Sequence, residues 1–203
     1  MIITGKLALW RYMAVWTFAE ATCVIMGISY NKSLSTPKYT DWTAVYNVNF
    51  WNNETSITLQ GTIESFNIQT NKWASMYVFK RLKWLQNKML SHFITIIFLA
   101  LWHGLWPGYF ITLTFEFIAI ICERQFIQFI KKNTNLTNVT GLPYLFLWCG
   151  SYFLKQVMLM YPLMSFMLLS WDACWQFMSS VYWIGHVTAL LWLLFPFKSF
   201  TLF

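Results

Sequence analysis

Long apolar blocks alternate with short polar intervals along this sequence. The blocks cover residues 7–28, 93–122, 142–170 and 181–197. A helix of about 20 apolar residues crosses the roughly 30 Å hydrocarbon core of a bilayer. The pattern therefore predicts an all-α, multi-pass transmembrane helical bundle, with residues 1–203 forming a single membrane domain. The third block is long enough for one tilted helix and a turn, or for two short helices.

The second block is interrupted at Pro107-Gly108. Proline removes a backbone donor and glycine frees the chain, so the helix is expected to kink or break there. Broken helices at membrane depth are tolerated only where protein or a cavity covers them. We therefore expect a functional site near Pro107. The charged residues of the first block, Arg11 and Glu20, are expected to face a protein interior or a wet cavity.

A basic amphipathic segment lies at the end of the polar interval that separates the first two blocks. Its apolar positions recur at spacings of four, three and four, which is one face of a helix: Val78, Leu82, Leu85 and Met89. The opposite face and its edge are basic: Lys80, Arg81, Lys83 and Lys88. This pattern predicts a helix lying in the membrane interface. A cytoplasmic linker helix is the alternative.

Both polar intervals that flank the second block are basic, with seven basic residues in 31–90 and three in 123–141. The positive-inside rule places both in the cytoplasm, which requires the block between them to enter and return or to cross twice. A single crossing is the alternative, and it leaves one basic interval on the opposite side of the membrane. Residues 131–141 are predicted to form a loop. Four glycosylation sequons do not decide the topology, because such matches are frequent by chance: Asn31, Asn53, Asn135 and Asn138.

The composition also indicates lipid as the solvent. Charged residues make up 10% of the chain, against about 25% in soluble globular domains. The 13 Trp and 10 Tyr suit the membrane–water interface. The net charge of +7 is interpreted as basic loops beside anionic lipid, not as a nucleic-acid surface. The four cysteines are scattered and are interpreted as small buried hydrophobic residues, and no metal-ligand cluster is present.

Three histidines are the candidates for acid–base chemistry. His103 lies well inside the second apolar block, just before the break, and intramembrane ionisable residues are functional candidates. Imidazole is suited to accept a proton near neutral pH. The alternative is a core histidine bonded to a neighbouring carbonyl. His92 is expected to be interfacial, and His186 is expected to pack or to form an interhelical hydrogen bond.

Several motifs recur together along the chain: Ser65–Trp73, Tyr77–Lys83, Phe98–Gly108, Glu116 with Glu123–Gln125, Trp171-Asp172 and Gly185-His186. This set resembles the membrane-bound O-acyltransferase family, and the lysophospholipid acyltransferase branch in particular. The likeness runs from about Trp42 onward and corresponds to the C-terminal part of longer family members. It implies an active-site pair, Asn67 and His103, that is 103 − 67 = 36 positions apart. Gln69 and Lys72 depart from the branch pattern.

The resemblance implies an acyl-CoA:lysophospholipid O-acyltransferase of the endoplasmic reticulum membrane, with lysophosphatidylcholine as the acceptor. Acyl-CoA is then a co-substrate, and no metal or other cofactor is required. The residues Lys80, Arg81 and Lys83 are expected to attract the phosphates of acyl-CoA, although lipid headgroups explain the same residues. The expected partners are acyl-CoA, a lysophospholipid and the bilayer, and homo-oligomerisation is left open.

Three other readings of the sequence remain open. The first is an enzyme of the same family with a different acceptor. The second is a truncated, non-catalytic homologue that acts as a scaffold. The third is a channel or transporter subunit whose intramembrane charges line a pore, which leaves the motifs around Asn67 and His103 unexplained.

Overall fold

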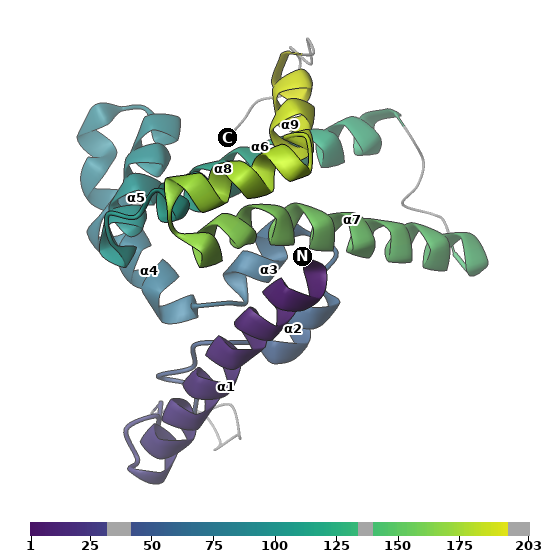
Figure 1. Ribbon diagram of the computed structural model, residues 1–203. Helices are drawn as coiled ribbons and strands as arrows, with labels where there is room; N and C mark the ends of the chain where they lie inside the picture. Colours follow the sequence, from purple (N-terminus) through teal and green to yellow (C-terminus); the bar gives the residue numbers. More distant parts are fainter. Residues whose placement is uncertain (32–41, 134–139, 195–203) are drawn as a thin grey trace.

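The computed structural model describes residues 1–31, 42–133 and 140–194, and all regular secondary structure in these ranges is helical (Figure 1). In chain order the elements are α1 (Ile2–Ile25), α2 (Phe50–Thr55), α3 (Leu59–Glu64), α4 (Ile68–Tyr77), the 3-10 helix η2 (Phe79–Leu85), α5 (Lys88–His103), α6 (Pro107–Asn133), α7 (Leu142–Leu168), α8 (Trp171–Ser180) and α9 (Ile184–Leu194). The all-α prediction is confirmed for this part of the chain. Some predicted features lie outside the described residues: Lys32, Lys38, the sequons at Asn135 and Asn138, and positions 134–139 and 195–197.

Short polar residues begin several of these helices. Asn49, Thr58, Asn87 and Ser170 each accept a backbone N–H of the first turn through the side chain. Side-chain oxygens at this position satisfy donors that have no partner within the helix. Short polar side chains therefore fix where these helices begin.

The predicted break of the second apolar block is confirmed. Helix α5 ends at His103, Gly104 adopts a φ of 132°, and α6 begins at Pro107. Proline suits the first position of a helix, where its missing N–H costs nothing. Helix α6 extends beyond the apolar block to Asn133, and it includes the start of the loop predicted for 131–141. The third block is one continuous helix, α7, with Pro162 inside it.

The sequence predicts one amphipathic helix around Val78. The prediction of a continuous helix is wrong, but the predicted apolar and basic faces are correct. A 3-10 helix covers residues 79–85, Gln86 turns the chain with a φ of 51°, and α5 then starts. The four apolar positions of the pattern are half-buried, whereas the four basic positions are exposed. The side-chain pattern therefore predicted burial although the helix is interrupted.

Helices α6 and α7 pack along each other and form the centre of the molecule, with α8 beside them (Figure 1). A hydrophobic cluster containing Phe115, Ala119, Tyr161 and Met178 joins α6, α7 and α8. The N-terminal end of α1 contacts α7, and the rest of α1 extends away from the other helices (Figure 1). Arg11 on α1 is exposed and Glu20 is half-buried, so Arg11 is not covered by the described residues of this chain.

Among the described helices, none is by itself both long enough and apolar enough to cross a bilayer. The pair α8 and α9, bent by 76° at its break, meets the test of length and composition together. Helix α5 is apolar but shorter.

Candidate active site

His103 lies where three helices meet. It is the last residue of α5, and its imidazole packs against Tyr109 at the start of α6 and Phe166 near the end of α7, with ring centroids 5.4 and 4.9 Å away. Tyr109 and Phe166 also contact each other, at 4.7 Å. The His103 side chain is exposed and makes no hydrogen bond with any described residue. It is therefore not the core histidine bonded to a carbonyl that the sequence left as an alternative.

The meeting of α6 and α7 beside His103 depends on Gly108. Its N–H donates to the Leu169 carbonyl at 2.9 Å. A Cβ at this position would collide with the Ser165 backbone carbonyl. One turn later, the buried hydroxyl of Thr112 donates to the Pro162 carbonyl at 2.7 Å. The rings that flank His103 are thus fixed by a close approach of two backbones.

Asn67 begins α4 in an unusual conformation. Its φ and ψ are 51° and 44°, in the left-handed region that asparagine tolerates better than most residues. Its side chain is half-buried and makes no hydrogen bond with any described residue. Two side chains that could act on a substrate, Asn67 and His103, are therefore both free of hydrogen bonds to the described residues.

Helix α4 is docked to α5 by Trp73. The Trp73 ring stacks on Phe98 with centroids 6.0 Å apart and lies 5.6 Å from the ring of Trp102, the neighbour of His103. The helix that begins at Asn67 is thereby attached to the helix that ends at His103. No hydrogen bond joins the two predicted active-site side chains to each other in the described structure.

The predicted phosphate-binding residues Lys80, Arg81 and Lys83 lie on η2. All three are exposed, and none forms an ion pair within the described residues. Trp84 beside them is 74% exposed. This segment therefore presents a basic surface with an aromatic side chain, which can bind phosphate groups or an anionic lipid surface.

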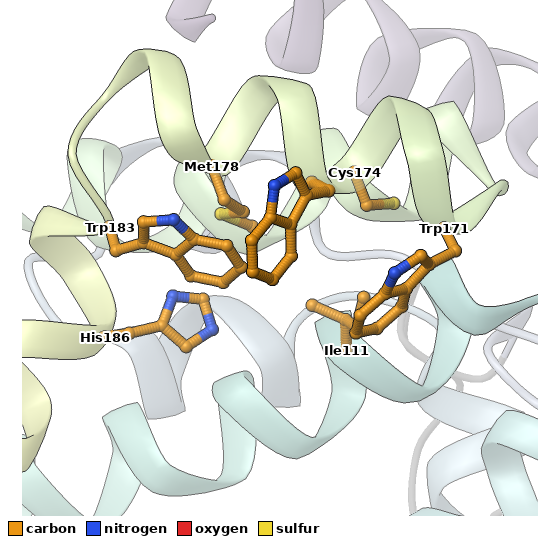
Figure 2. A pocket seen from close by; sticks show the side chains of 7 residues that line it. Ile111, Trp171, Cys174, Met178, Trp183 and His186 are labelled. Atoms are coloured by element: carbon orange, nitrogen blue, oxygen red, sulfur yellow. The ribbon is translucent and has the colours of Figure 1, made fainter.

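An apolar pocket of about 200 Å³ lies between α6, α8 and α9 (Figure 2). Its wall consists of Ile111, Trp171, Cys174, Trp175, Met178, Trp183 and His186. Sequence reasoning missed this pocket, although the spacing of three tryptophans around α8 was a signal. Ile111 is two residues beyond Tyr109, so the pocket lies along the same helix as one of the rings that contact His103.

His186 has the packing role that the sequence predicted. Its Nδ1 lies 2.8 Å from the Tyr161 hydroxyl, which is an interhelical hydrogen bond between α9 and α7. Its ring also packs against Phe115 and Trp183. His92 is half-buried between Phe79 and Phe117. Burial lowers the pKa of His92, and the nearby charge of Arg124 lowers it further.

Glu123 of α6 holds the segment that leads to Asn67. Its carboxylate accepts the N–H groups of Leu59 and Gln60 at 2.6 and 3.2 Å, so it caps α3 from another helix. Arg124 adds a hydrogen bond to the Gln60 side chain at 3.0 Å. Burial raises the pKa of Glu123, and the two backbone N–H groups oppose this shift.

Several charged side chains lie close together around the middle of α7. Lys155 of α7 is 3% exposed and lies over the Tyr152 ring. Lys6 of α1 pairs with Glu54 of α2 at 2.8 Å, and the charges of this pair act on Lys155. The described residues hold no group of three or more His, Cys, Asp or Glu side chains that could bind a metal ion. The sequon at Asn53 is inaccessible, because that side chain is 1% exposed and donates to the Thr62 carbonyl.

Comparisons with known proteins identify relatives of this chain. The model of the membrane-bound O-acyltransferase family matches residues 1–164. Lysophospholipid acyltransferase 5 of Homo sapiens is 36% identical over 189 residues, which is 92% of this chain and 39% of that protein. The Bos taurus protein of the same name is 37% identical, with the same coverage. Lysophospholipid acyltransferase of Saccharomyces cerevisiae is 32% identical over 55% of this chain and 18% of its own length. The chain thus spans about 39% of the two animal relatives.

Proposed function

The chain belongs to the membrane-bound O-acyltransferase family, and on that premise we propose that it is an acyl-CoA:lysophospholipid O-acyltransferase of the endoplasmic reticulum membrane. The observation that carries the proposal is the exposed imidazole of His103, which packs against Tyr109 and Phe166 at a helix break. It forms no hydrogen bond within the described part of the chain. A general base needs a lone pair that no protein donor occupies and a fixed direction of approach.

In the proposed reaction, His103 takes the proton of the free glycerol hydroxyl of a lysophospholipid. The hydroxyl oxygen attacks the thioester carbonyl carbon of acyl-CoA, and a new C–O bond forms. The C–S bond then breaks, and the leaving thiolate takes the proton from the imidazolium, which restores neutral His103. One positioned proton transfer contributes about 10²- to 10⁴-fold to the rate.

Asn67 is proposed as the second active-site residue. Its amide has two donors and one acceptor oxygen, none of which is engaged by the described protein. Such a group can orient the imidazole of His103 or donate to the oxygen on which negative charge develops. The attachment of α4 to α5 through Trp73 keeps both residues on one packed unit.

Two further surfaces suit the two substrates. The exposed cations of Lys80, Arg81 and Lys83 are proposed to attract the phosphates of acyl-CoA. The pocket walled by three tryptophans is proposed to hold part of a hydrocarbon chain, because its lining is largely apolar and the His186 ring is already bonded to Tyr161. Lysophosphatidylcholine is the proposed acceptor, and multi-pass insertion is the proposed state of the chain.

The test is transfer of a labelled acyl group from acyl-CoA to lysophosphatidylcholine by membranes that contain this chain. His103→Ala is expected to lower the rate at least about 100-fold. His92→Ala is the matched control, because it deletes the same ring from a position between Phe79 and Phe117 and is expected to retain activity. A rate for the unmodified chain no higher than that of empty-vector membranes overturns the proposal and favours a non-catalytic scaffold. Parallel assays with other lysophospholipids identify the acceptor.

A further inference from the structure

The start of α4 lacks the cap that its first residue would ordinarily supply. An N-cap residue usually has an extended backbone, and its side-chain oxygen accepts the N–H of the second or third helical residue. Asn67 occupies this position with a left-handed backbone and makes no such bond. The first N–H groups of α4 must therefore find acceptors elsewhere.

Asn47, twenty positions earlier, supplies both acceptors. Its backbone carbonyl accepts the N–H of Ile68 at 2.9 Å, and its side-chain Oδ1 accepts the N–H of Gln69 at 2.9 Å. Gln69 is the second helical residue, whose N–H an asparagine at position 67 would ordinarily bind. The Asn47 Oδ1 thus accepts the Gln69 N–H, which would otherwise donate to the side-chain oxygen of Asn67.

The two segments are fastened to each other by further bonds. The Gln69 side chain donates to the carbonyls of Ala44 and Tyr46 at 3.2 and 2.9 Å. The N–H of Asn49 donates to the Ser65 carbonyl at 2.8 Å. Residues 44–49 therefore run beside residues 65–69, and the position of the Asn47 cap is well determined.

Asn71 fixes the same turn from inside α4. Its side-chain amide donates to the carbonyls of Ile63 and Phe66 at 3.1 and 2.9 Å, and its N–H donates to the Asn67 carbonyl at 3.0 Å. The backbone on both sides of Asn67 is held, while the Asn67 side chain is not. This is the arrangement of a group whose position is fixed and whose polar atoms are available.

We propose that Asn47 is a positioning residue for acyl transfer: by capping α4 in place of Asn67, it keeps the Asn67 amide available to substrate and to His103. This inference rests on the proposed function, in which Asn67 acts at the active site. Without the Asn47 Oδ1, the N–H of Gln69 recruits the Asn67 side chain as an ordinary N-cap and withdraws it from the reaction.

The test is a double-mutant cycle on the acyl-transfer rate of membranes that contain this chain. Asn47→Ala is expected to lower kcat about 10- to 100-fold with little change in KM, as displacement of a reacting group does. Asn47→Asp keeps the acceptor oxygen and is expected to retain most of the rate. In the Asn67→Ala background, Asn47→Ala is expected to cause no further loss, because its effect passes through Asn67.

Asn49→Ala is the matched control. Asn49 caps α2 through an equivalent bond to the Asn52 N–H at 3.0 Å, and it lies two residues from Asn47. It removes a cap of the same kind without touching the first turn of α4, so it is expected to lower Tm but not kcat. A loss of kcat equal to that of Asn47→Ala would show a general effect of loosening this segment and would overturn the inference.

The activities of the Asn47→Ala and Asn67→Ala variants distinguish a wrong positioning role from a wrong active-site pair. If Asn67→Ala inactivates the chain and Asn47→Ala does not, or if their effects on the rate simply add, the positioning role is wrong. If Asn67→Ala keeps full activity, the active-site pair itself is wrong. The Tm of the purified chain gives a second readout that needs no activity. Asn47→Ala is expected to lower Tm by a larger amount in the Asn67→Ala chain, where no replacement cap exists, than in the unmodified chain. Equal changes in Tm in the two chains overturn the inference.

Discussion

The N–H of Gly108 donates to the carbonyl of Leu169 at 2.9 Å, which brings the first turn of α6 against the end of α7. No Cβ fits there, because it would collide with the Ser165 carbonyl. Both rings that hold His103 come from these two helices, since Tyr109 lies on α6 and Phe166 on α7. The geometry around His103 therefore depends on the absence of a side chain at position 108.

Gly108→Ala is expected to push α6 and α7 apart, to cost about 1–3 kcal/mol of stability as overpacking does, and to lower the acyl-transfer rate. Gly150→Ala is the control, because a Cβ there meets no atom within 4 Å. Gly150 lies inside α7, so alanine is expected to stabilise the chain by about 0.5–1 kcal/mol. Denaturant unfolding in detergent measures both, and equal effects of the two substitutions would contradict the close approach at Gly108.

Tyr161→Phe is expected to cost about 1 kcal/mol, because it removes the hydroxyl 2.8 Å from His186 Nδ1 and leaves the imidazole without this partner. Tyr182→Phe removes the same atom from a side chain that is 88% exposed and is expected to have no measurable effect. The comparison is made by thermal unfolding. A Tm for Tyr161→Phe that matches the unmodified chain would argue against a structural bond between α7 and α9.

Ile111→Trp is expected to fill part of the tryptophan-walled pocket. If the pocket holds a hydrocarbon chain, transfer involving long chains should fall about tenfold relative to short chains, since one methylene in a pocket changes discrimination by that order. Leu190→Trp adds the same ring at a position that is 58% exposed, and it controls for bulk alone. An identical chain-length profile in both variants and in the unmodified chain would exclude the pocket as a chain-binding site.

Replacing Lys80, Arg81 and Lys83 together by glutamine is expected to raise KM for acyl-CoA at least about tenfold and to leave kcat nearly unchanged. Each basic residue near an anionic surface contributes on the order of 1 kcal/mol. The difference should shrink as salt rises, because the Debye length falls to about 3 Å at 1 M. Lys131→Gln, an exposed cation at the other end of α6, is the control. A higher KM for the lysophospholipid instead would assign the cations to its headgroup.

Glu123 predicts a pH dependence of stability. Its pKa is raised by burial in the folded chain, so between the unfolded pKa of about 4.3 and the higher folded pKa, the folded state holds a proton that the unfolded state has released. Stability contributed by the protonated group is therefore lost as pH rises through this window. Glu123→Gln removes the titration. The stability of the unmodified chain relative to this variant should fall from pH 4 to pH 7, and a constant difference would contradict the shift.

The histidines show how far sequence reasoning reached within the site. His103 was predicted as a candidate because it is an ionisable side chain inside an apolar block, just before a proline-glycine break. His186 was expected to pack or to form an interhelical hydrogen bond, although its partner Tyr161 could not be named. Asn67 came only from the resemblance, because an asparagine among other polar residues has no local signal. The roles of Asn47 and Glu123 were not predicted, since each acts on a helix distant in sequence.

The sequence by itself determined the features that depend on neighbours within a few residues. The helix break at Pro107, the helical class, and the buried and exposed faces of residues 78–89 follow from backbone sterics and side-chain periodicity, which are local. Tertiary structure decided which chain segments meet: Asn47 with α4, Glu123 with α3 over a separation of 64 residues, and the tryptophans with Ile111. Such contacts depend on how packed helices fill space, and local preference contains no information about a partner so far along the chain.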